Sequence, residues 1–183
     1  MRYRIPLVLA GVMAVIGLSA PAALASAPLA GTDQLPPTNT ACSVGTTYGP
    51  YHIMTNDNNS VGITYHGAVN QATVTTSPGD SRLEVAQCVG GSPIYVIHNA
   101  AGNCLRMHDA SSGFGVYEQN GCDLSNTEEQ FALEQGSNSS LYTFENIGWG
   151  LWLGVNCPAT NNEGVIGVQN APGNCLNWQL QTP

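Results

Sequence analysis

Side chains that could grip an uncharged, hydroxyl-rich ligand lie in two segments of the chain. An aromatic ring can lie under the apolar face of a sugar, while amides or carboxylates can fork onto neighbouring hydroxyls. Residues of these types that fall outside the expected core register are Asp109, Tyr117, Asn120, Trp152, Gln169 and Asn170. These six residues are therefore the candidate carbohydrate-binding side chains.

Each candidate also has a purely structural interpretation. Trp152 alternates with Leu151 and Leu153 and should face away from the core, either to contact a ligand or to cover neighbouring strands. Tyr117 has the same two possible roles. Asp109 falls in the segment 108–113, which is typical of a turn, so a turn-capping role is favoured for it over ligand binding.

Catalytic and metal-binding patterns are weak. Gly79-Asp80-Ser81 matches only the beginning of a hydrolase motif, in a segment typical of a β-turn rather than of a strand-to-helix turn. The four histidines fall at strand or loop positions and form no set with serine and aspartate. No CxxC pair and no zinc-finger spacing occurs. We expect no enzyme activity, no cofactor and no metal.

The first 25 residues have the three parts of a secretory signal peptide. Arg2 and Arg4 precede an uncharged apolar run over 5–18, and Ala23-Leu24-Ala25 supplies small residues for cleavage after Ala25. The alternative is a retained membrane anchor, but the run is short and no stop-transfer charges follow. We expect a secreted, extracellular protein that has no membrane contact after cleavage.

The chain beyond the predicted cleavage site is strongly acidic. It keeps two cations, Arg82 and Arg106, with no lysine, against all twelve acidic residues, so its formal charge is −10. Such a surface repels phosphate backbones, and we expect no nucleic-acid binding. Because charged residues are nonetheless few, the surface must consist mainly of amide, hydroxyl and glycine groups, which suit neutral polar ligands.

Short apolar alternations recur through the chain and predict an all-β fold. Apolar triplets return every 44 to 48 residues, and each unit also holds a single inward valine. The triplets begin at Tyr51, Tyr95 and Tyr142, at Val61, Leu105 and Leu151, and at Leu83, Phe131 and Trp178, and the inward valines are Val74, Val116 and Val168. Three units of four strands fit a β-trefoil, with a β-sandwich as the alternative.

We therefore divide the chain into a signal peptide (1–25), a flexible leader (26–47) and a β-trefoil domain (48–183). Its repeats should cover about 48–90, 91–136 and 137–183. Six cysteines lie beyond the signal peptide, and an even count in an exported chain predicts three disulfides. Six cysteines allow 15 pairings.

The second repeat resembles a ricin B-type lectin repeat. The resemblance rests on Gly102-Asn103-Cys104-Leu105, then Val116, then Cys122, then Glu129-Gln130-Phe131. As a repeat pattern it extends over about 48–183 and is clearest in 95–134. It implies a β-trefoil that binds carbohydrate, and it implies a disulfide between Cys104 and Cys122.

The departures from that family concern its sugar-binding residues. Arg106 stands where the family has an acidic residue that grips two sugar hydroxyls. The positions of the family's Asn-Gln-x-Trp motif fall at 128–131 in the second repeat and at 175–178 in the third, and neither segment keeps the full motif. The hydrophobic position at the end of the motif is kept in all three repeats, as Leu83, Phe131 and Trp178. The resemblance therefore supports the fold more strongly than a particular sugar site.

The other four cysteines can be paired by their places in the repeats. Cys157 and Cys175 both fall in the third repeat, and Cys42 and Cys88 bracket the first, so we predict Cys42–Cys88, Cys104–Cys122 and Cys157–Cys175. The predicted function is a secreted, non-catalytic carbohydrate-binding module that binds glycans weakly. The alternative is a secreted protein-binding or protease-inhibitor trefoil that has lost its sugars, although the polar loops 56–60 and 158–163 offer no obvious anchor.

Overall fold

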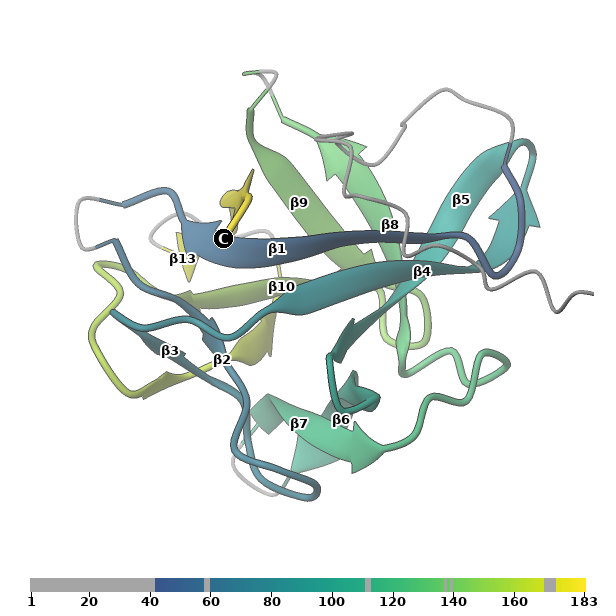
Figure 1. Cartoon of the computed structure of the whole chain (residues 1–183). Helices are drawn as coiled ribbons and strands as arrows, with labels where there is room; N and C mark the ends of the chain where they lie inside the picture. Colours follow the sequence, from purple (N-terminus) through teal and green to yellow (C-terminus); the bar gives the residue numbers. More distant parts are fainter. Residues whose placement is uncertain (1–41, 58–59, 111–112, 137, 139, 170–173) are drawn as a thin grey trace, which may run out of the picture. The chain divides into compact units, whose positions relative to one another are not determined.

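The computed structural model describes residues 42–57, 60–110, 113–136, 138, 140–169 and 174–183. These residues form an all-β fold (Figure 1). Its strands are β1 (Thr47–Thr55), β2 (Gly62–Thr64), β3 (Thr73–Thr75), β4 (Ser81–Val89), β5 (Ser92–Asn99), β6 (Asn103–Ala110), β7 (Gly113–Asn120), β8 (Gln130–Gln135), β9 (Tyr142–Asn146), β10 (Leu151–Asn156), β11 (Glu163–Gly164), β12 (Ile166–Val168), β13 (Asn174–Cys175) and β14 (Trp178–Gln181).

Six strands pair in a closed, antiparallel circuit. β1 pairs with β4, β4 with β5, β5 with β8, β8 with β9, β9 with β14, and β14 returns to β1. The circuit leaves none of its strands with an unpaired edge, which removes a common route to aggregation. A closed sheet of this kind differs from the two-sheet sandwich that was the alternative prediction.

The closed sheet is filled by large apolar side chains from alternating positions. Those that are almost completely buried include Tyr95, Phe131, Tyr142, Phe144 and Trp178. Each stabilises the fold by roughly 1.5–3 kcal/mol through removal of apolar surface from water. The indole Nε1 of Trp178 donates a hydrogen bond to the carbonyl of Leu153 at 2.9 Å, so its one polar group is satisfied inside the core. The predicted core positions of these strands are therefore confirmed.

Three hairpins lie beside the closed sheet: β2–β3, β6–β7 and β10–β12. They meet in a triangle of buried backbone hydrogen bonds. Ala72 N–H donates to the Val116 carbonyl (2.8 Å), Val116 N–H to Val165 (3.0 Å), and Val165 N–H to Ala72 (2.8 Å). Each hairpin is thereby bonded to both of the others, which fixes their relative positions.

This triangle corrects one predicted core residue. Val168 was expected to be the third inward valine, but it is half-buried, whereas Val165 is fully buried beside Val116. Val165 sits at a break between β11 and β12. The alternation of inward and outward side chains does not continue across a break in a strand. The period-two pattern therefore predicted Val168 instead of Val165 as the inward valine.

Residues just before β1 are held against β4. Gly45 N–H donates to the Val85 carbonyl at 2.8 Å, and Val85 N–H donates to the Thr46 carbonyl at 2.9 Å. The end of the predicted leader is thus fixed from Cys42 onward, because that residue is also bonded to Cys88. The predicted signal peptide and residues 26–41 lie outside the described residues. Within the described part of the chain, no helix has the length and apolar character needed to cross a bilayer.

Three disulfides join Cys42 to Cys88, Cys104 to Cys122, and Cys157 to Cys175. They are the three pairs predicted from the sequence, so that prediction is confirmed. The bonds close segments with sequence separations of 46, 18 and 18 residues. Proteins with several structural disulfides are typical of oxidising compartments such as the extracellular space.

Candidate functional site

The most developed surface site lies on the hairpin of β6 and β7. Arg106 pairs with Tyr117 and His108 pairs with Gly115 across this hairpin. Side chains of β-strands alternate between faces, and Leu105, Met107 and Val116 are accordingly fully buried. Arg106, His108 and Tyr117 belong to the opposite, outward face.

The Tyr117 ring lies over Gly115. A Cβ atom added at Gly115 would come within 2.6 Å of Cε2 and 3.0 Å of Cζ and the hydroxyl oxygen of Tyr117. The glycine therefore leaves the space in which the aromatic ring rests along the strand. Because Tyr117 is only half-buried, part of the ring remains exposed. A flat aromatic surface of this kind can lie under the apolar face of a sugar.

Tyr117 forms one wall of a hollow of about 310 Å³. Asp109, His108, Arg106 and Gln119 also line it. The prediction that Asp109 lies in a turn was wrong: β6 extends to Ala110, and Asp109 pairs with Phe114 of β7. Strand pairing continues as far as Ala110 and Gly113, further than the polar composition of 108–113 suggested. The structure thus brings two predicted site residues, Asp109 and Tyr117, into one hollow.

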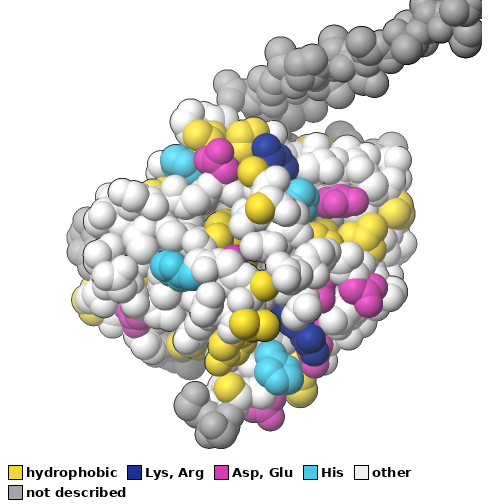
Figure 2. Space-filling view, turned by 60° about the horizontal axis from the view of Figure 1, so that its bottom comes forward, with side chains coloured by type: hydrophobic (Ala, Val, Ile, Leu, Met, Phe, Trp, Pro, Cys, Tyr) yellow, Lys and Arg dark blue, Asp and Glu magenta, His cyan; other side chains and the backbone are white. Residues whose placement is uncertain are grey.

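A second hollow, of about 330 Å³, adjoins the first. Arg106 and Gln119 line both hollows, and Asn120 lines the second. Asn120 is exposed at the end of β7. In Figure 2, where the side of β6 and β7 comes forward, acidic and basic side chains are scattered over a larger area of other side chains and backbone. All three second-repeat candidates therefore lie in two joined hollows.

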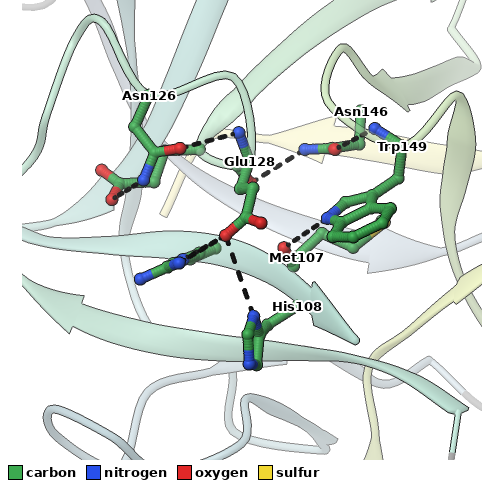
Figure 3. A network of polar contacts seen from close by, with 8 residues as sticks. Met107, His108, Asn126, Glu128, Asn146 and Trp149 are labelled. Atoms are coloured by element: carbon green, nitrogen blue, oxygen red, sulfur yellow. Dashed lines mark hydrogen bonds and ion pairs between the residues drawn. The ribbon is translucent and has the colours of Figure 1, made fainter. Parts of the chain in front are cut away.

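Arg106 forms an ion pair with Glu128. Arg106 Nε donates to Glu128 Oε2 at 2.6 Å, and Nδ1 of His108 lies 3.8 Å from the same oxygen (Figure 3). Glu128 lies in the loop before β8. Because of this pairing, Arg106 presents no free positive charge to the first hollow.

Two buried carboxylates beside the hollows are occupied by protein groups. Glu118 is 1% exposed and accepts hydrogen bonds from the backbone amides of His66 and Gly67. Glu129 is 2% exposed and accepts from the Asp123 amide at 2.8 Å and from Asn126 Nδ2 at 3.2 Å. Burial raises the pKa of the Glu129 carboxyl above its usual range, although these hydrogen bonds oppose the rise. These acids position loops, which leaves Asp109 as the exposed carboxylate among the residues lining the first hollow.

Trp149 anchors the hairpin from the turn between β9 and β10. Its indole Nε1 donates to the Met107 carbonyl at 3.1 Å (Figure 3), and its ring centroid lies 4.9 Å from that of Phe114. Trp149 is nevertheless 39% exposed. Sequence reasoning named Trp152 instead, although Trp149 stands between two glycines, a sequence typical of an exposed turn.

The third-repeat candidates lie elsewhere. Trp152 is half-buried on β10, opposite Val168 and Glu145, and it is not among the residues that line either hollow. Gln169 is exposed immediately after β12. Asn170 lies outside the described residues. The structure therefore keeps Trp152 and Gln169 apart from the hollows around Tyr117.

The partial hydrolase motif is accounted for by structural contacts. Ser81 is fully buried, and its Oγ lies 2.8 Å from the Tyr65 hydroxyl. Asp80 lies 3.2 Å from Nε2 of His52 on the surface. In the ranges that the structure describes, no group of three or more His, Cys, Asp or Glu side chains is arranged to hold a metal ion.

Neither a family model nor a curated protein matches the sequence. Solved structures do match the fold. A designed 3-fold symmetric protein, ThreeFoil, is 14% identical, with 74% of this chain and 100% of that chain covered and a TM-score of 0.58. The cytolethal distending toxin of Haemophilus ducreyi is 15% identical (73% and 83% covered, TM-score 0.55). Gallus interleukin-1 beta, as a mutant, is 10% identical (76% and 97% covered, TM-score 0.54). At these identities the likeness shows the fold alone, which is β-trefoil-like.

Proposed function

We propose that this protein is a secreted, non-catalytic carbohydrate-binding module whose domain is a β-trefoil of three four-stranded repeats. One observation carries the proposal: the Tyr117 ring lies over Gly115 and forms a wall of a surface hollow that the exposed residue Asp109 also lines. An aromatic surface with adjacent hydrogen-bonding groups is the combination that sugar recognition requires.

The roles of the side chains follow from their chemistry. Tyr117 supports the apolar face of one sugar ring. An ionised Asp109 can only accept hydrogen bonds, so it takes protons from hydroxyls, while the amide of Gln119 can both donate and accept. The hollow is open and small, which favours weak binding by one site and useful binding only when several sites act together.

Export is part of the proposal and has separate support. The N-terminal 25 residues carry the signal-peptide pattern, and the three disulfides require an oxidising compartment to form and persist. Mass spectrometry of the protein from culture medium tests both points. A mature N-terminus at Ser26 and the absence of free thiols are the expected results.

A glycan array with the disulfide-bonded chain from residue 26 tests the function. We expect reproducible binding to a related set of uncharged sugars. Tyr117→Ala should lower the affinity about tenfold, equivalent to roughly 1.4 kcal/mol, because the stacking surface is lost. Tyr117→Phe keeps the aromatic ring and serves as the matched control, so it should retain most of the affinity.

Trp152→Ala distinguishes the two predicted regions. If the site lies in the third repeat and includes Gln169 and Asn170, Trp152→Ala should weaken binding without loss of fold. In that case Tyr117→Ala should leave binding unchanged. Loss of binding in Tyr117→Ala alone places the site at β6–β7. A blank array from a chain shown to be folded by circular dichroism would contradict the proposal and favour the protein-binding alternative.

A further inference from the structure

A third hollow shares Tyr117 with the first of the two hollows around Arg106. This third hollow, of about 200 Å³, is lined by Tyr117, Phe114 and Gly115 of β7 together with Gln71, Ile166 and Gly167. Tyr117 is the shared wall of the first and third hollows, and Arg106 and Gln119 are shared by the first and second. The three hollows therefore follow one another along β7.

The length of this row exceeds one sugar ring. β7 runs from Gly113, which lines the third hollow, to Asn120, which lines the second. At about 3.3 Å per residue its eight residues span roughly 23 Å. Tyr117 stands in the middle of this span. A ligand that used all three hollows would have to be an extended chain of several units.

The walls of the row are suited to uncharged ligands. Its accessible polar groups include the amides of Gln119 and Asn120, and its arginine is paired with Glu128. The remaining exposed charges are negative. Asp109 is exposed at the first hollow, and hydrogen bonds from Ser125 lower the pKa of the Asp123 carboxyl at the second, which keeps it ionised. Chains of uronic acids or sulfated sugars would be repelled.

The walls are also fixed before any ligand arrives. Gln71 Nε2 donates to the Val165 carbonyl at 3.0 Å, which holds one end of the row, and Glu118 fastens the loop at His66 and Gly67 behind the middle. At the other end, Glu129 accepts a hydrogen bond from the Asp123 amide at 2.8 Å. Preorganised walls reduce the entropy lost on binding, so even a shallow groove can discriminate chain length.

We propose that the three hollows form one groove that binds an internal stretch of a linear, uncharged glycan chain, with a sugar ring over Tyr117 and neighbouring units on both sides. This inference rests on the proposed carbohydrate-binding function and adds the class of ligand. A site for a single terminal sugar would need only the first hollow.

Calorimetric titration with size ladders tests the groove. The probes are cello-, chito- and manno-oligosaccharides from monosaccharide to hexasaccharide, with oligogalacturonates as the anionic ladder. For at least one neutral ladder we expect affinity to rise at least about tenfold from the monosaccharide to the tetrasaccharide, which corresponds to roughly 1.4 kcal/mol. Oligogalacturonates should show no binding.

Variants locate the chain in the groove. Asn120→Ala removes an exposed amide at one end and should lower affinity for the hexasaccharide several-fold while leaving the disaccharide unchanged. Tyr117→Ala should weaken every length. Gln181→Ala, which removes an exposed amide on β14, is the control and should change neither.

The outcomes separate the two proposals. Equal affinity for monosaccharides and hexasaccharides, or oligogalacturonates that bind as well as neutral chains, would overturn the groove and leave the single-sugar site standing. No binding to any ladder or to the array would overturn both.

Discussion

A single glycine controls how Tyr117 is presented. In Gly115→Ala the new Cβ would lie 2.6 Å from Cε2 of Tyr117, so the aromatic ring must swing off the strand. Because the colliding atoms are the far end of one side chain, stability should change by less than about 1 kcal/mol. Glycan affinity should fall nearly as far as in Tyr117→Ala, as measured by titration.

The double variant isolates this effect. If Gly115 acts through Tyr117, Gly115→Ala should cause no further loss in the Tyr117→Ala background, which is the expected coupling between neighbouring positions. An equal additional loss in that background would show that Gly115 affects binding in some other way.

At the scale of elements, Asn146 at the end of β9 joins three segments. Its Nδ2 donates to the Glu128 carbonyl at 2.9 Å, and its Oδ1 accepts from the Trp149 amide at 3.1 Å (Figure 3). The same Nδ2 also donates to the Gln130 carbonyl at 3.1 Å. The side chain is fully buried. Asn146→Ala would leave buried backbone groups without partners, so we expect a loss of about 3 kcal/mol in the free energy of unfolding.

Urea denaturation measures this loss. Asn120→Ala, an exposed amide on β7, should stay within about 0.5 kcal/mol of the original protein. A loss below about 1 kcal/mol in Asn146→Ala would mean that water replaces the missing amide, and that this junction is less closed than its burial indicates.

The strands also differed in how well the sequence predicted them. β9 around Phe144 was predictable because its buried and half-buried residues alternate strictly along the strand. The broken strand around Val165 was not, since pairing across a break follows neighbouring strands rather than local periodicity. The same holds for Asp109, whose strand continued because β7 paired with it.

At the scale of the whole molecule, the disulfides should differ in their contribution. Cys42–Cys88 closes a longer loop than Cys157–Cys175, with separations of 46 and 18 residues. The loop-entropy model gives roughly 4 and 3 kcal/mol, because the longer cross-link removes more freedom from the unfolded chain. Replacing each pair by alanines and comparing urea midpoints tests this order. A larger loss for Cys157–Cys175 would indicate that native-state packing dominates instead.

Local periodicity in the sequence was enough to predict the all-β class and the spacing of the core triplets. The cysteine pairs were only favoured, one by the lectin resemblance and two by position within the repeats, because cysteine spacing does not fix which cysteines pair. The sequence also supplied Asp109, Tyr117 and Asn120 as candidates, because residue type alone limits the chemistry.

Which candidates share a site depends on how the strands pair and pack. The Tyr117 ring rests on Gly115, the Arg106 charge is met by Glu128 from a distant loop, and Trp149 rather than Trp152 anchors the hairpin. Each of the last two facts depends on contacts between residues more than twenty positions apart, and the first on which way an aromatic side chain leans along its strand. Strand pairing and side-chain packing fix these contacts, and neither leaves a mark in the local sequence pattern.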